Sequence, residues 1–180
     1  MAELRRLKVV GYDSNIKLDY IDDYYLPITL RDNSPTSSGR YWWHLSASNR
    51  YLLEVGIDSY KNYLSKVVLV TTSGNLKKIE YHTDYELLHL GTPIFDTSPW
   101  TENMTELSKF SSPVLKSKML FSLLVGENRM TLLLENCNKS SIGYQSNNVI
   151  IETDIDGLFT GITLLNLSTQ NIANITQIYS

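Results

Sequence analysis

A hairpin pattern near the carboxyl end constrains the fold of this chain more than any other feature. Apolar residues run through Val149–Asp156 as far as the dipeptide Asp156-Gly157, and they resume over Leu158–Leu165. Asp-Gly between two apolar runs is a strong signal for a β-hairpin, because both residues tolerate the positive φ of a tight turn. A weaker copy occurs at Leu53–Asp58, after which a turn leads into a similar strand over Leu64–Val70. The sequence therefore predicts a chain built from β-hairpins.

Short apolar segments separated by turn residues recur along the chain. For example, Lys118–Val125 and Arg129–Glu135 flank Gly126-Glu127-Asn128, which predicts a hairpin with a three-residue loop. Such spacing predicts an all-β or β-rich α+β fold, with antiparallel hairpins forming a sandwich or two packed small sheets. We expect a single compact domain over residues 1–180, with the alternative of two related β-rich halves, 1–95 and 113–180, joined by 96–112.

Two segments depart from the strand pattern. The sequence Ser98-Pro99-Trp100-Thr101-Glu102 is typical of a helix start, with Ser98 at the N-cap and Pro99 at the first helical position. One short helix is therefore predicted near residues 99–110. The tail, residues 168–180, mixes Asn, Thr and Ile, so we expect it to add an edge strand or to stay partly loose.

Charge and hydropathy limit the classes of function. The formal net charge of −3 resides in residues 96–180, because residues 1–95 hold equal numbers of acidic and basic side chains. A general nucleic-acid binder has a basic face, so direct nucleic-acid binding is not expected. No run approaches the roughly 18 apolar residues of a membrane helix, and the amino-terminal residues lack the apolar core of a signal peptide. These features, with a single cysteine, Cys137, predict a cytoplasmic protein without membrane contact.

Three carboxylates are the main candidates for catalysis. Glu152, Asp154 and Asp156 alternate with apolar residues, and alternate positions of a strand share a face, where oxygen ligands can hold a hard cation. The turn chemistry alone explains these acids, so a solvated strand face is favoured. The chain has three histidines, without the close spacing of a helical metal motif, and no cysteine- or serine-nucleophile signature. We therefore predict no catalytic residue, metal site or cofactor, with a metal- or ligand-dependent enzyme as the alternative.

Aromatic residues next to acids predict a protein-binding surface. In Tyr20–Tyr25, two adjacent acids lie among three tyrosines, and aromatic anchors surrounded by charge are typical of protein interfaces. The alternative is a strand turn whose tyrosines pack inward. Trp42-Trp43 poses the same question, because on a strand one ring faces the core and the other faces outward. The predicted partner-binding residues are Tyr20, Asp22, Asp23, Tyr24, Tyr25, Trp42 and Trp43.

Two segments carry a resemblance to bacterial families. The segment from Asp154 through Gly161-Ile162 to Leu165-Asn166 resembles the end of a small, functionally uncharacterised bacterial domain family. The first half, with Gly11-Tyr12-Asp13 and Ser38–Trp43, resembles immunity proteins of polymorphic or contact-dependent toxin systems. The second resemblance implies a non-enzymatic protein that binds and occludes a cognate toxin domain, most plausibly a nuclease. A structural or accessory protein is the further alternative, and the sequence leaves the oligomeric state open.

Overall fold

The hairpin predicted near the carboxyl end is formed by strands β14 (Val149–Thr153) and β15 (Phe159–Leu164). At its turn the Asp154 side chain accepts hydrogen bonds from the amides of Asp156 and Leu158, at 3.1 and 2.9 Å. Gly157 has φ of +79°, and a Cβ there would lie 3.0 Å from the Val9 carbonyl oxygen, so the turn requires glycine. The Asp-Gly prediction is confirmed.

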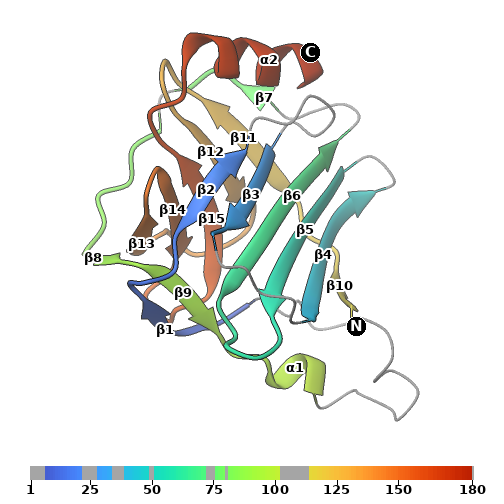
Figure 1. The fold of residues 1–180 in the computed structure, drawn as a ribbon. Coiled ribbons are helices and arrows are strands. Elements are labelled where there is room, and N and C mark those ends of the chain that lie inside the picture. Colours follow the sequence, from blue (N-terminus) through green and yellow to red (C-terminus); the bar gives the residue numbers. More distant parts are fainter. Residues whose placement is uncertain are drawn as a thin grey trace.

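The chain forms a β-sandwich of two sheets, with a separate two-stranded pair (Figure 1). A computed structural model describes residues 7–21, 28–33, 39–48, 51–71, 76–79, 81–101 and 114–179. The prediction of a β-rich fold with packed sheets is confirmed.

The first sheet has six strands in the order β10-β4-β5-β6-β3-β2. Strands that follow one another in the sequence, β4 with β5 and β5 with β6, pair antiparallel, and β10 pairs parallel to β4 at one edge. Its strands are β2 (Leu18–Ile21), β3 (Ile28–Asp32), β4 (Arg40–Ser48), β5 (Tyr51–Asp58), β6 (Leu64–Thr71) and β10 (Val114–Ser117).

The second sheet has seven strands in the order β7-β11-β12-β15-β14-β13-β8. Its five central strands pair antiparallel, whereas β7 and β8 add parallel strands at the two edges. The strands not yet introduced are β7 (Leu76–Lys77), β8 (Leu87–Leu90), β11 (Phe121–Val125), β12 (Met130–Leu134) and β13 (Ile142–Ser146). A hairpin turn occurs where the sequence predicts, but four residues, 126–129, separate the strands in place of the three predicted, and the Gly126 amide donates to the Arg129 carbonyl at 3.0 Å.

One hydrophobic core lies between the two sheets. Trp43 of the six-stranded sheet packs edge-on against Phe159 of the seven-stranded sheet, with ring centroids 5.7 Å apart. Both side chains are essentially inaccessible to solvent, as are Leu45, Leu53 and Ile151 around them. Burial of apolar surface from both sheets in one cluster stabilises their packing.

Each large sheet takes one or more of its edge strands from the half of the chain that does not supply its central strands. Strand β10, which follows residue 113, pairs with β4, while β7 and β8 from the first half form the edges of the seven-stranded sheet. The two-stranded pair consists of β1 (Val9–Asp13) and β9 (Thr92–Phe95). Residues 1–95 and 113–180 therefore both contribute strands to each large sheet.

Helix α1 (Ser98–Thr101) begins where the sequence predicts, and residues 102–113 lie outside the described part of the chain. The expectation for the tail is wrong, because residues Thr169–Tyr179 form helix α2, which lies across one end of the sandwich (Figure 1). Ser168 and Asn171 form a reciprocal cap: the Asn171 amide donates to Ser168 Oγ at 3.1 Å, and the Ser168 amide donates to Asn171 Oδ1 at 3.1 Å. Ile172 and Ile175 then anchor α2 on the core.

Candidate functional site

Strand β4 presents its two adjacent tryptophans to opposite sides of the six-stranded sheet, as the sequence predicts. Trp43 is fully buried and donates from Nε1 to Ser117 Oγ at 2.9 Å. A side chain at this depth belongs to the core, so Trp43 is not available to a partner, contrary to its inclusion among the predicted binding residues. Trp42 lies on the outer face and is partly exposed.

The indole of Trp42 lies across a glycine on the neighbouring strand. Trp42 and Gly56 are directly opposite in the β4–β5 pairing. A Cβ on Gly56 would lie 3.1 Å from Cζ3 and 3.3 Å from Cη2 of Trp42, which is closer than ordinary van der Waals contact. The absence of a side chain at position 56 therefore leaves the space in which the ring lies against β5.

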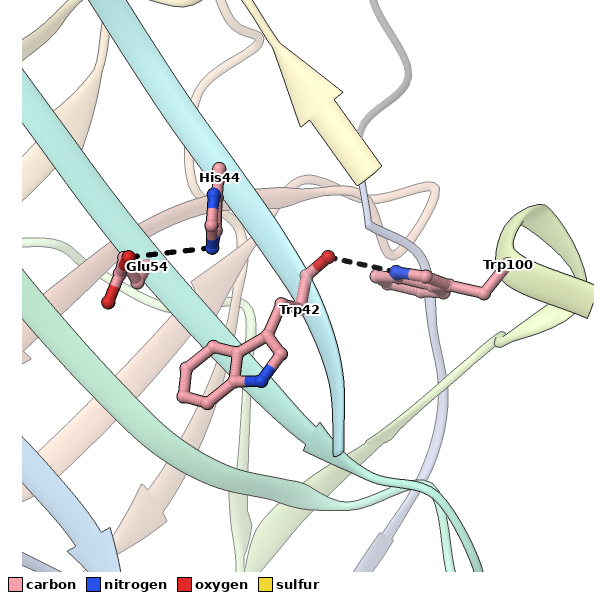
Figure 2. A network of polar contacts seen from close by, with 4 residues as sticks. All are labelled: Trp42, His44, Glu54 and Trp100. Atoms are coloured by element: carbon pink, nitrogen blue, oxygen red, sulfur yellow. Dashed lines mark hydrogen bonds and ion pairs between the residues drawn. The ribbon is translucent and has the colours of Figure 1, made fainter. Parts of the chain in front are cut away.

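The backbone of Trp42 is also held in place. Nε1 of Trp100, on α1, donates a hydrogen bond to the Trp42 carbonyl oxygen at 2.9 Å (Figure 2). Trp100 is only 3% exposed, and its ring stacks on Tyr41 with centroids 5.7 Å apart. The ring and the main chain of Trp42 are thus both constrained, which reduces the conformational entropy that a partner would have to remove on binding.

An imidazole and a carboxylate lie beside this ring. His44 and Glu54 are opposite each other on β4 and β5, and His44 Nε2 is 3.5 Å from Glu54 Oε1 (Figure 2). Their side chains are 25% and 28% exposed, so both remain accessible to solvent. The contact is an ion pair when the imidazole is protonated. The His44 ring also lies edge-on to Trp42, at a centroid distance of 6.4 Å.

Basic side chains extend this face across the sheet. Lys66 is opposite Gly56, Arg31 is opposite Lys66, and Lys116 of β10 is paired with His44. Cross-strand partners share one face of a sheet, so these cations lie on the same side as Trp42. We call this surface the Trp42 face; it comprises Trp42, His44, Glu54, Gly56, Lys66, Arg31 and Lys116. Its three Lys and Arg side chains outnumber the two acids on the same face, Glu54 and Asp19, the second of which lies opposite Arg31, although the chain as a whole is acidic.

Tyr20, another of the predicted binding residues, does not lie on this surface. Tyr20 pairs with Leu30, which pairs with Val67, and its side chain packs against the core. Tyr20 therefore points to the opposite side of the sheet from Trp42. Asp22, Asp23, Tyr24 and Tyr25 lie outside the described residues, so their prediction stands as it was made.

The three candidate carboxylates serve different local structures. Glu152 and Asp154 are fully buried, whereas Asp156 is exposed. The prediction that these acids lie on a solvated strand face is therefore wrong for Glu152 and Asp154, whereas the predicted turn is present. Asp154 holds the turn and also accepts a hydrogen bond from Asn138 Nδ2 at 3.0 Å. Within the described ranges, no three His, Cys, Asp or Glu side chains are grouped closely enough to hold a metal ion.

The structure instead places Glu152 in a polar cluster that sequence reasoning did not find. Glu152 Oε1 accepts hydrogen bonds from the Tyr85 hydroxyl at 3.0 Å and from Thr163 Oγ1 at 2.6 Å. Burial raises the pKa of Tyr85, and the adjacent Glu152 carboxylate raises it further. No sequence pattern connects these residues, because Tyr85 and Glu152 are separated by 67 positions.

This cluster lies under residues 81–86, which cross the outer face of the seven-stranded sheet toward β8 (Figure 1). Arg129 holds the same segment by donating from Nη1 to the Tyr81 carbonyl at 3.2 Å and by contacting His82 Nδ1 at 2.9 Å. Glu152 is shielded from solvent by this arrangement. Through the Tyr85 hydroxyl, the Glu152 carboxylate attaches the crossing segment to the sheet.

Comparisons with known proteins do not place the chain in a family. A scan against protein-family models gave no match, and a search of curated proteins gave no relative. Among the described residues, neither helix has the length and apolar character needed to span a bilayer. Inference about function therefore depends on the surfaces of the molecule.

Proposed function

We propose that this chain is a non-enzymatic binding protein, specifically a bacterial immunity protein that binds a cognate toxin domain and occludes it. The observation that supports this proposal is the constrained position of Trp42 on an accessible sheet face. The Trp42 ring lies against Gly56, and the Trp42 carbonyl accepts a hydrogen bond from Trp100. Tryptophan and arginine are the residues that most often dominate the energy of protein interfaces, and both occur on the Trp42 face.

The mechanism would be occlusion by a preformed surface. A fixed indole offers apolar area with little loss of side-chain entropy on binding. Lys116 on one side of strand β4, and Lys66 and Arg31 on the other, add positive charge to the same face of the sheet. This charge favours an acidic region of the toxin domain and increases the rate of encounter at low salt. The acidic segment at Asp22-Asp23 stays a predicted second contact, suited to a basic region such as a nuclease cleft.

The test is capture of the partner by tagged full-length protein from lysate of the native host, with three forms in parallel. Wild type and Ile155→Ala should retain the same captured protein, because Ile155 is 62% exposed in the β14–β15 turn of the other sheet. Trp42→Ala should weaken its binding by about 30-fold, the equivalent of the roughly 2 kcal/mol typical of a central interface tryptophan. Melting curves would establish that all three forms are folded.

The captured protein must then behave as a toxin. Expressed alone it should arrest bacterial growth, and co-expression of the wild-type chain should restore growth. A captured protein without toxicity would contradict the immunity proposal. Equal capture by wild type and Trp42→Ala would instead show that the Trp42 face is not the contact surface.

A further inference from the structure

Strand β8 is an edge strand with an unusual side-chain pattern. It pairs with β13 on one side and is the last strand of the seven-stranded sheet (Figure 1). Leu87, Leu88 and Leu90 are 49%, 45% and 68% exposed, so three of its four residues present large apolar side chains to solvent. Exposed apolar residues that cluster on one strand mark an interaction site more often than isolated ones do.

The backbone of β8 has hydrogen-bonding groups that face away from the sheet. The amides of Leu87 and Gly91 donate to the carbonyls of Ser141 and Gln145, at 3.4 and 2.8 Å, and thus point toward β13. Because alternate residues of a strand direct their N–H and C=O groups to opposite sides, the groups of Leu88 and Leu90 point toward the free side. In the described part of the chain, no strand pairs with β8 on that side. These groups fit an additional extended strand.

The other sheet edges in the described ranges carry residues that oppose such pairing. Lys77 lies on β7, Lys116 on β10, Asp19 on β2 and Asp13 on β1, while β9 contains Pro93. Proteins commonly protect free edges with charge or proline, because like charges facing each other, or a missing N–H, disfavour edge-to-edge association. The Leu-Leu-His-Leu sequence of β8 contains neither an acid, a lysine, an arginine nor a proline. Among these edges, β8 is therefore the one that can pair with its own copy without repulsion between permanent charges.

We propose that β8 forms an antiparallel pair with β8 of a second copy of this chain, which joins the two seven-stranded sheets into one. His89 lies opposite His89 of the other copy in this register, and Leu88 exchanges backbone hydrogen bonds with Leu90 of the other copy. Both outward-facing residues of each strand are then satisfied. A symmetric contact between identical surfaces is the commonest form of protein dimer.

The directions of the β8 side chains agree with the proposed antiparallel register, in which His89 lies opposite His89 of the other copy. His89 pairs with Tyr144, which belongs to the core, so His89 is on the inner side of the sheet and Leu88 and Leu90 are on the outer side. The position of Leu88 is confirmed by its contact over Gly143, where a Cβ would lie 2.8 Å from Leu88 Cδ1. Pairing of two copies gathers two leucines from each on one face and removes them from water. The Trp42 face stays free, because it belongs to the other sheet.

The first test is the molar mass of the full-length protein by sedimentation velocity from about 1 μM to about 1 mM, a range that includes weak association. We expect dimer to increase with concentration, and protection of the Leu88 and Leu90 amides from hydrogen exchange to increase with it. Ile155→Lys should dimerise like wild type, because this exposed residue belongs to the β14–β15 turn and not to β8. A wild-type protein that stays monomeric over the whole range would overturn the proposal.

Two matched double variants test the register. Leu88→Lys with Leu90→Lys places like charges opposite each other across the interface, whereas Leu88→Glu with Leu90→Lys places opposite charges there. Both double variants remove the same two leucines, so any difference between their dimer dissociation constants reports the cross-strand pairing of the introduced charges. The Glu/Lys form should dimerise about 10-fold more tightly than the Lys/Lys form. Equal dissociation constants would exclude this register, and a Lys/Lys form that dimerises as tightly as wild type would exclude β8 as the interface.

Discussion

The hydroxyl of Tyr85 should stabilise the protein at neutral pH and lose this effect in alkali. Tyr85→Phe removes the donor to Glu152 Oε1, which retains its bond from Thr163. A hydrogen bond to a charged group contributes about 1.5–3 kcal/mol. Because Tyr85 is itself partly exposed and Glu152 keeps another donor, we expect the free energy of unfolding at pH 8 to fall by about 1.5 kcal/mol, at the lower end of that range.

The pH dependence follows from the raised pKa of Tyr85. In the unfolded chain this phenol loses its proton near pH 10, whereas in the folded protein it retains the proton to higher pH. The unfolded state then binds fewer protons than the native state, so the free energy of unfolding decreases as pH rises above about 10. The slope from this one group is at most about 1.4 kcal/mol per pH unit, reduced by its partial exposure to solvent.

Urea unfolding of wild type and Tyr85→Phe at pH 8, 9.5 and 10.5, followed by circular dichroism, measures both effects. The difference in unfolding free energy between the two proteins should be largest at pH 8 and should narrow above pH 10. The reason is that only wild type contains Tyr85, whose hydroxyl has a raised pKa in the folded protein. Tyr60→Phe is the matched control, since Tyr60 is 82% exposed and its hydroxyl should contribute little. A difference that stays constant or widens from pH 8 to 10.5 would refute the linkage between Tyr85 and Glu152.

Two further predictions concern local stability. Ser117→Ala removes the acceptor of the buried Trp43 Nε1–H and should destabilise the protein by about 1–3 kcal/mol, seen as a lower melting temperature; an unchanged melting temperature would show that the bond contributes nothing net. Ser168→Ala removes one half of the reciprocal cap with Asn171 and should lower stability by about 1 kcal/mol, with amide exchange accelerating mainly in α2; uniform acceleration would argue against a local cap effect.

Local chemistry explains which parts of the fold could be read from the sequence. The Asp156-Gly157 turn was predictable because glycine at position 157 fits the positive φ that the turn requires, and the alternation of Trp42 and Trp43 follows from the two-residue period of a strand. Helix α2 had a local signal in Ser168 and Asn171. Its Asn, Thr and Ile residues have low helix propensity, however, and contact of Ile172 and Ile175 with the core outweighs that preference.

The candidate site was predictable only in part. The sequence indicated that one of the two adjacent tryptophans faces outward, but not that Gly56 leaves space for its ring or that Trp100 holds its carbonyl, because these residues are brought together only by strand pairing and by α1. The placement of Tyr20 against the core separates it from Trp42, although both lie on the same sheet.

The sequence by itself determined the hairpins, the alternation of Trp42 and Trp43 between the two sides of their strand and the β-rich class of the fold. Only the tertiary structure decided that β10 joins β4, that β8 becomes a free edge and that Glu152 is buried against Tyr85. The physical reason is the range of the interactions. Turn geometry and side-chain alternation depend on neighbouring residues, whereas edge pairing and burial depend on which distant segments together remove the most apolar surface from water while satisfying their backbone hydrogen bonds.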